Sequence, residues 1–212
     1  KLPNSNFTVT LPQPWTYEMH FAKRLNQFAE EQTINSNDIV MLGNSITEGG
    51  NWSKLLGLEN VRNRGISGDI TSGILKRLEQ TVKGNPKKIF LLIGINDLAN
   101  NVSNDSILKN ITKITEEIKR ISPKTEIYLQ SILPVNESFG RFARINGKTT
   151  EILRVNKAIS DLAKSKRLHF INLFPLFTQP GTNILRIDLT YDGLHLSEAG
   201  YRVWAEELKK WL

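Results

Sequence analysis

The sequence contains no cysteine, only three histidines and no long apolar run among its 212 residues. The absence of cysteine excludes disulfide bonds, thiolate metal sites and a cysteine nucleophile. No stretch approaches the roughly 18–20 apolar residues that a transmembrane helix needs, so we expect no membrane span. Metal-ligand spacings and the glycine patterns of phosphate- and dinucleotide-binding loops are also missing, and we expect no metal and no cofactor. The Gly-X-Ser-X-Gly elbow of α/β-hydrolases is absent as well.

The chain is basic, with a formal net charge of +7 and a pI near 9.6. Such a balance can indicate nucleic-acid binding. The basic residues are dispersed, however, and between Lys113 and Lys124 they are interleaved with Glu116 and Glu117, as on a solvated helix face. We therefore expect no nucleic-acid partner.

Short apolar segments alternate with longer helical patterns along the chain. Residues 1–16 are polar, with prolines at positions 3, 12 and 14, and are predicted to form an extended arm, whereas residues 17–212 are predicted to form a single domain. Apolar spacing and cap residues predict helices over 17–32, 52–56, 70–83, 103–121 and 148–165, and from Ser197 to about 211. Apolar runs predict strands over 38–43, 60–63, 88–93, 126–132 and 168–173.

Strands that are separated by helices need crossover connections, which predicts a parallel sheet with helices on both faces. Ligands in such open sheets bind outside the carboxyl ends of the strands. We therefore expect the chemistry to lie just after Leu42, Asn63, Ile93, Ile132 and Leu173.

Ser45, Asp192 and His195 are the parts of a serine-hydrolase triad. Ser45 follows the first predicted strand, and Asp192 precedes His195 by three residues near the other end of the chain. Taken alone, Ser45 could instead cap the helix that follows it, and His195 could be a surface residue before the last helix. His20 is expected in the first helix and His169 as a packed strand residue, so His195 has little competition as a general base.

Four segments carry a more specific signal, and they are Gly43-Asn44-Ser45-Ile46, Asn63-Arg64-Gly65-Ile66-Ser67-Gly68-Asp69, Gly94-Ile95-Asn96-Asp97 and Asp192-Gly193-Leu194-His195. In their order and at their predicted strand ends they resemble the four blocks of the SGNH, or GDSL, esterases and lipases, and they span residues 43–195. The resemblance implies a flavodoxin-like three-layer α/β/α sandwich with a five-stranded parallel sheet. The chain departs from the GDSL name at Asn44 and Ile46, neither of which carries the reaction in that family.

The resemblance also implies a role for each site residue. Ser45 is expected to be the nucleophile, His195 the general base and Asp192 the residue that orients the imidazole. The oxyanion hole is expected to consist of the backbone N–H groups of Ser45 and Gly68 and the side-chain amide of Asn96. Taken alone, Gly68 and Asn96 could be ordinary turn or cap formers.

Three further acidic residues accompany these segments. Asp69 and Asp97 are interpreted as hydrogen-bond partners around the site, without a role in the reaction. Asp188 is an alternative to Asp192 as the acidic residue of the triad, but its spacing from His195 fits the triad pattern less well.

The spacing of the segments resembles small single-domain members that act like platelet-activating-factor acetylhydrolases and carbohydrate O-acetylesterases. The resemblance predicts an esterase that removes a short acyl group, acetyl, from a carbohydrate or other small ester through an acyl-enzyme. The alternatives are a lysophospholipase or thioesterase and an inactive glycan-binding module. A lysophospholipase or thioesterase needs an apolar groove, which Phe139, Phe142 and Phe177 could line, although the same three residues could equally belong to the core.

The substrate-facing loops are predicted over 134–147 and 174–189. Arg141, Arg144 and Arg186 lie in them and could bind an anionic group, or could serve ordinary loop packing. The expected partner is a small-molecule or glycan ester, and the oligomeric state stays open. Because the sequence begins at Lys1 rather than Met, we expect that an upstream segment is removed and that the protein is exported, with a cytoplasmic location as the alternative.

Overall fold

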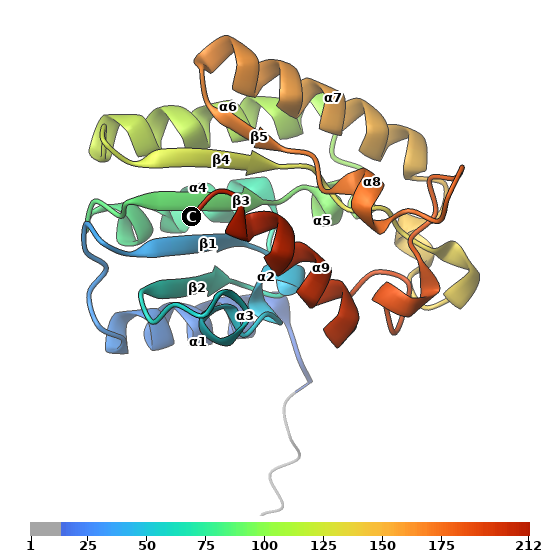
Figure 1. Cartoon of the computed structure of the whole chain (residues 1–212), viewed down its shortest axis with the longest axis horizontal. Helices are drawn as coiled ribbons and strands as arrows, with labels where there is room; N and C mark the ends of the chain where they lie inside the picture. The colour runs from blue at the N-terminus through green and yellow to red at the C-terminus, as the bar shows by residue number, and fades with distance from the viewer. Residues whose placement is uncertain (1–13) are drawn as a thin grey trace, which may run out of the picture.

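The computed structural model describes residues 14–212 (Figure 1). The extended arm expected over residues 1–16 therefore lies mostly outside the described residues. A five-stranded sheet forms the centre of the molecule, and helices lie on both of its faces. This arrangement confirms the three-layer α/β/α sandwich that the sequence predicts.

All neighbouring strands of the sheet are parallel, in the order β2-β1-β3-β4-β5. The strands are β1 (Ile39–Gly43), β2 (Val61–Gly65), β3 (Lys88–Leu92), β4 (Glu126–Gln130) and β5 (His169–Ile171). β1 and β3 are buried along their whole length, because helices cover both faces. Gly43 is in register with Gly65 on one side and Leu92 on the other, so three strand ends meet at one edge of the sheet.

Two groups of helices cover the two faces. On one face α6 (Asn104–Ile121) packs between α4 (Thr71–Val82) and α7 (Thr149–Lys166). On the other face α3 (Trp52–Leu56) packs against α9 (Glu198–Lys209). The first helix, α1 (Tyr17–Glu30), lies beside the end of β2, where the Arg24 guanidinium donates to the carbonyl oxygen of Gly65 at 3.1–3.2 Å. None of the described helices has the length and apolarity that crossing a membrane would require.

The predicted element ends agree with the structure where a cap residue marks them. Ser197 caps α9 by accepting from the Gly200 N–H, and Gly57 ends α3 with a φ of 69°. β2 continues two residues beyond its predicted end at Asn63, because Arg64 and Gly65 still pair with β1, and the buried Arg64 side chain forms an ion pair with Glu31 at the end of α1.

Several short helices escaped the sequence analysis, since three to five residues are too few to show a helical period. These are α2 (Ser45–Glu48), α5 (Ile95–Ala99), α8 (Phe174–Phe177) and the 3₁₀ turns η1 (Glu137–Phe139), η2 (Ala143–Ile145) and η3 (Ile187–Leu189). Two of them, α2 and α5, begin directly beyond the ends of β1 and β3.

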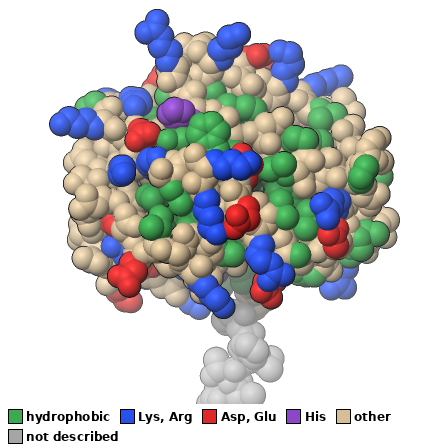
Figure 2. All heavy atoms as spheres, in the orientation of Figure 1, with side chains coloured by type: hydrophobic (Ala, Val, Ile, Leu, Met, Phe, Trp, Pro, Cys, Tyr) green, Lys and Arg blue, Asp and Glu red, His purple; other side chains and the backbone are tan. Residues whose placement is uncertain are grey.

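Charge is spread over the surface rather than gathered in one place. On the face drawn in Figure 2, Lys and Arg side chains lie among Asp and Glu side chains and apolar groups. Most of the ion pairs on the exposed helix surfaces join residues three or four positions apart, as in the Lys157–Asp161 and Arg202–Glu198 pairs. This pattern is typical of solvated helix faces.

The last helix is anchored by Trp204, which is fully buried. Its ring meets the Trp52 ring edge-on at a centroid distance of 4.6 Å, and its indole N–H donates to the Gln130 side-chain oxygen at 2.7 Å. The start of α9 is bonded in turn to η3, because the Ser197 N–H donates to the Leu189 carbonyl at 2.9 Å. Helix α9 therefore supports the loop that carries residues 190–195.

Replacing Trp204 with alanine should lower the free energy of unfolding by about 3–5 kcal/mol, because it empties a filled core site between α3 and α9. Urea denaturation followed by circular dichroism measures this loss. Trp204→Phe is the matched control, since it keeps an aromatic ring but leaves Gln130 without its donor, and should cost about 1–3 kcal/mol. A loss below about 1 kcal/mol for Trp204→Ala would contradict the anchoring role.

Candidate active site

Ser45 is the first residue of α2, directly beyond the carboxyl end of β1. Asn44, not Ser45, caps this helix, because its side chain accepts a hydrogen bond from the Ile46 N–H at 3.1 Å. The alternative interpretation of Ser45 as the helix cap is therefore wrong. The turn from strand to helix is tight because Gly43 has no Cβ, which would otherwise meet the Thr47 side chain and the Leu92 carbonyl oxygen.

Ser45, His195 and Asp192 form one chain of hydrogen bonds. His195 Nε2 lies 3.0 Å from Ser45 Oγ, and His195 Nδ1 lies 2.7 Å from Asp192 Oδ2. Because a carboxylate can only accept, Nδ1 carries the proton and Nε2 is free to accept from the Ser45 hydroxyl. The structure thus brings together the three residues that the sequence singled out, across 150 positions of the chain.

A strained turn sets the spacing of Asp192 and His195. Gly193 has a φ of 88°, and a Cβ at this position would meet the Asn136 carbonyl oxygen. The Asn136 N–H donates in return to the Gly193 carbonyl at 2.8 Å, which joins the turn to the loop after β4. Inside the turn, Thr190 Oγ1 accepts from the Gly193 N–H at 2.9 Å. Glycine is the residue that adopts such a backbone conformation at low cost.

The Asp192 carboxyl is held in its ionised form. Burial alone raises its pKa, but the His195 ring and the backbone N–H groups of His195 and Leu194 all donate to it, and together they bring the pKa below its ordinary value. An ionised carboxylate at this point favours the imidazole tautomer that can accept the Ser45 proton.

Three N–H donors face the same cleft as the serine hydroxyl. Gly68 has a φ of 82°, and Asn96 lies in the first turn of α5, after Gly94. The Asn96 side-chain amide donates one hydrogen to the Asp69 carbonyl at 2.9 Å, and an amide group has a second hydrogen to offer. Among the described residues, no acceptor is bonded to the backbone N–H of Ser45 or of Gly68. These groups have the composition of an oxyanion hole.

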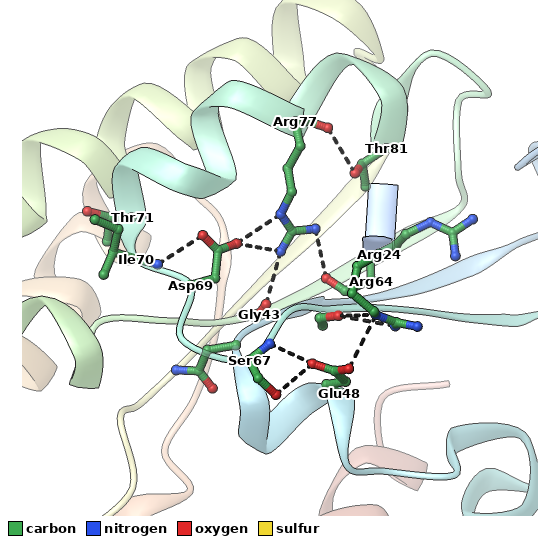
Figure 3. A network of polar contacts seen from close by, with 12 residues as sticks. Arg24, Gly43, Glu48, Arg64, Ser67, Asp69, Ile70, Thr71, Arg77 and Thr81 are labelled. Atoms are coloured by element: carbon green, nitrogen blue, oxygen red, sulfur yellow. Dashed lines mark hydrogen bonds and ion pairs between the residues drawn. The ribbon is translucent and has the colours of Figure 1, made fainter. Parts of the chain in front are cut away.

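A single buried guanidinium holds the segments around this hole (Figure 3). Arg77 of α4 donates from Nε to Asp69 at 2.9 Å, and its Nη2 lies 2.8 Å from the same carboxylate oxygen as an ion pair. The same group donates to the Arg64 carbonyl at 2.9 Å and to the Gly43 carbonyl at 3.0 Å. It therefore joins the ends of β1 and β2 to the loop that contains Gly68. Burial raises the pKa of the Asp69 carboxyl, while Arg77 and the Tyr17 hydroxyl oppose that rise.

Glu48, the last residue of α2, connects the serine helix to the same loop. Its carboxylate accepts from the Ser67 hydroxyl at 2.7 Å and from the Ser67 backbone N–H, as Figure 3 shows. It also pairs with His20 at 3.0 Å and with Arg24 at 3.4 Å, both on α1. Burial alone raises the Glu48 pKa, but the hydrogen bonds from His20 and Ser67 outweigh burial and leave it below the ordinary value.

Ser45, His195, Gly68 and Asn96 line a cleft of about 980 Å³, and Asp192 is joined to this cleft through its hydrogen bond to His195. Its rim includes the segment 141–145 after β4, together with Trp15 and Tyr17 near the start of the described chain. Of the three phenylalanines proposed to line an apolar groove, only Phe142 lines the cleft. Phe177 is fully buried in the core, and Phe139 packs beside Gly193.

The remaining acidic residues occupy structural positions. Asp97 accepts from the backbone N–H and the hydroxyl of Thr71, at 2.6–3.2 Å, and so joins α5 to the start of α4. Asp188 is exposed and forms an ion pair with Arg186 at 2.6 Å, so it does not contact His195. Neither competes with Asp192.

The other histidines lie outside the triad. His20 pairs with Glu48. His169 stacks on Tyr128 at a centroid distance of 4.4 Å, but its side chain is 46% exposed, so the expectation of a packed residue was only half right. In the part of the chain that the structure describes, no cluster of His, Asp and Glu side chains has the geometry of a metal site.

Sequence reasoning missed Arg77 and Glu48, because charged residues on predicted helices are expected to face solvent. One signal could have revealed Arg77. It lies at helical spacing from Ile74, Leu78 and Thr81, on the buried face of α4. A charged residue on the apolar face of a helix indicates a buried partner.

Comparison with known proteins gives the family context of this arrangement. The model of the GDSL-like lipase/acylhydrolase family matches residues 41–203, a range that includes all five predicted site residues. Platelet-activating factor acetylhydrolase IB subunit alpha1 of Rattus norvegicus is 25% identical over 182 residues, which is 83% of this chain and 75% of that protein.

Solved structures share the fold. A Streptococcus pneumonia protein named for platelet activating factor superposes with a TM-score of 0.85 at 32% identity, covering 92% of this chain and 94% of its own. A GDSL-like lipase from Bacteroides thetaiotaomicron gives a TM-score of 0.78 at 25% identity, covering 90% of this chain and 95% of its own.

Substituting Arg77 by lysine should lower the free energy of unfolding by about 2 kcal/mol or more, because an ammonium group cannot reproduce the fork that contacts Asp69 and two carbonyls. Chemical denaturation measures the loss. The same exchange at Arg120, which is exposed and paired with Glu117, is the control and should cost less than about 0.5 kcal/mol. Equal effects at the two positions would show that the buried fork has no special role.

The Glu48→Gln variant should be less stable than the wild type near pH 7, and this difference should shrink as the pH falls. The pKa of Glu48 in the folded chain lies below the reference value of 4.5, so folding favours the ionised carboxylate. That stabilisation is complete above pH 4.5 and is lost as the pH falls through the lower folded value.

Urea denaturation of both proteins between pH 7 and pH 3 tests this pH dependence. Glu59→Gln is a suitable control, because Glu59 is exposed and forms no ion pair among the described residues. The control should remain within about 0.5 kcal/mol of wild type throughout. A difference for Glu48→Gln that grows toward acid would reverse the assigned direction.

Proposed function

Because the chain belongs to the GDSL-like lipase/acylhydrolase family, we propose that it is a serine esterase that removes an acetyl group from a carbohydrate. The observation that carries this proposal is the chain of hydrogen bonds from Asp192 through His195 to Ser45, in the same cleft as N–H groups that no described residue engages. Nucleophile, base and oxyanion donors are the components that acyl transfer requires.

In the first half of the proposed reaction, Ser45 Oγ attacks the carbonyl carbon of the ester while His195 Nε2 takes its proton. The Asp192 carboxylate stabilises the imidazolium that results. The carbonyl oxygen becomes negative, and the N–H groups of Ser45, Gly68 and Asn96 donate to it. Because Asn96 is already fixed by its bond to the Asp69 carbonyl, little reorganisation is needed when this charge develops.

The tetrahedral intermediate then releases the alcohol, whose oxygen takes the proton from His195, and the acetyl group stays on Ser45. In the second half a water molecule gives a proton to His195 and attacks the acetyl carbon. The bond to Ser45 Oγ breaks, Oγ recovers the proton, and acetic acid leaves. His195 serves as base and then as acid in each half.

Two of the three phenylalanines proposed for a long-chain groove do not line the cleft. The lysophospholipase or thioesterase alternative needs an apolar groove, for which Phe139, Phe142 and Phe177 were the candidates. Phe177 belongs to the core and Phe139 supports the catalytic turn, which leaves Phe142 alone at the cleft. The related proteins that are named acetylhydrolases agree with acetyl as the acyl group.

A carbohydrate as the alcohol is supported by the size and the lining of the cleft. A volume of about 980 Å³ is far larger than an acetyl group, so most of the space is available to the alcohol. Its lining includes both polar groups, such as Asn100, and aromatic rings, such as Trp15, a mixture suited to hydroxylated rings. An inactive glycan-binding module would use the same lining but would have no need of the Ser45–His195 hydrogen bond.

Hydrolysis of p-nitrophenyl esters from acetate to laurate tests the proposal. We expect kcat/KM to be highest for acetate and to fall by about tenfold or more by octanoate. Ser45→Ala should lower kcat by at least about 10⁴-fold, and Asn96→Ala by about 100-fold. The control Ser53→Ala, at an exposed position of α3, should behave as wild type.

The chain-length profile separates the alternatives. A preference for laurate would favour the lipase or thioesterase, and full activity of Ser45→Ala would refute the proposed nucleophile. Binding of acetylated glycans without turnover of any ester would favour the binding module.

A further inference from the structure

One wall of the catalytic cleft carries two arginines that have no acidic partner. Arg141 and Arg144 both line the cleft that contains Ser45. Neither guanidinium forms an ion pair with a carboxylate of the described residues. Glu18 is the one acidic side chain among the described residues that line this cleft, so its charge is net positive.

The lack of acidic partners sets these two side chains apart from most arginines of this protein. Seven of the eleven arginines form ion pairs within the described chain, and they are Arg24, Arg62, Arg64, Arg77, Arg120, Arg186 and Arg202. Two of the other four lie together at the catalytic cleft. The planar donors of a guanidinium group match the two oxygens of a carboxylate. At Arg141 and Arg144 no carboxylate of the described residues occupies these donors.

The segment that carries the arginines is held in place. Ile145 is buried beside them, and Glu137 accepts from the Gly147 N–H at 2.7 Å, which closes the loop. Between the arginines, the Phe142 ring meets the His195 ring edge-on at 5.5 Å. The two positive side chains therefore extend from a fixed loop beside the catalytic base, at the wall of the cleft that contains Ser45.

The part of the cleft beside Gly68 carries aromatic rings. A Cβ placed on Gly68 would lie 3.1 Å from the Tyr17 ring and 3.5 Å from the Trp15 ring. The Tyr17 hydroxyl is engaged with Asp69, whereas the Trp15 side chain is 63% exposed. An exposed indole at a cleft rim offers a flat apolar face to a sugar ring.

We propose that the alcohol portion of the substrate is an acidic sugar, with its carboxylate bound by Arg141 and Arg144 and its ring in contact with Trp15. This proposal rests on the proposed esterase function and specifies the substrate class of the same site. An acidic sugar would give these two guanidinium groups a carboxylate partner, which a neutral acetylated sugar lacks.

Inhibition of p-nitrophenyl acetate hydrolysis by unacetylated sugars tests the proposal without knowledge of the acetylated position. Trigalacturonate, the acidic probe, should inhibit competitively with a Ki about tenfold or more below that of neutral galactotriose. The Arg141→Gln/Arg144→Gln double variant should abolish this difference. The control Arg120→Gln/Arg154→Gln, which removes the same charge from exposed helix positions, should retain it.

Each other outcome has a distinct meaning. Equal inhibition by the two sugars, or acidic inhibition that persists in the cleft variant, overturns the proposal while leaving the esterase intact. Stronger inhibition by glycerol 3-phosphate than by trigalacturonate would replace the acidic sugar with a phosphate-bearing alcohol. If p-nitrophenyl acetate is not hydrolysed at all, the esterase function fails. Calorimetric titration with trigalacturonate then still decides whether the arginines bind a carboxylate.

Discussion

The buried guanidinium of Arg77 is the constraint on which the catalytic edge of this protein depends. Three hydrogen bonds and one ion-pair contact from one side chain reach the end of β1, the end of β2 and the loop that contains Gly68. The backbone carbonyls of Gly43 and Arg64 lie at this edge of the sheet, and buried carbonyls need donors. Arg77 donates to both of them, beside the Ile66 N–H that also donates to Gly43, and balances the charge of Asp69 at the same time. Serine and oxyanion donors are therefore held against each other by groups that take no part in the reaction.

A second set of contacts places the base independently. Asp192 and His195 lie on a turn that Gly193 makes possible and that Asn136 fixes from the loop after β4. Helix α9 supports this turn through its contacts with η3, and Trp204 anchors the helix to the core. The nucleophile is thus positioned by the strand ends, and the base by a loop and the last helix. The contacts that place the nucleophile and those that place the base meet at the hydrogen bond between Ser45 Oγ and His195 Nε2, which are 3.0 Å apart.

Much of this arrangement can be predicted from the sequence because it depends on local rules. Buried strands show as short apolar runs, and the carboxyl ends of parallel strands must share an edge, which brings Ser45, Gly68 and Asn96 together. What sequence alone could not predict depends on contacts between distant segments. β2 extends past Asn63 because Arg64 and Gly65 pair with β1, with Glu31 neutralising the buried Arg64, and Phe177 enters the core rather than the cleft. Trp15 is at the cleft only because α1 lies beside β2, and no local pattern encodes that placement.

The distance along the chain between Ser45 and His195 has a consequence for biosynthesis. These residues are 150 positions apart, and α9, which supports the base, follows both. At a synthesis rate of about 5–20 residues per second, roughly 8–30 s separate the appearance of the nucleophile from that of its base. The sheet strands and the serine turn can be made long before the site can work. An emerging polypeptide on the ribosome would therefore carry a serine that has no base, and hydrolytic competence would arise as one of the last events of maturation.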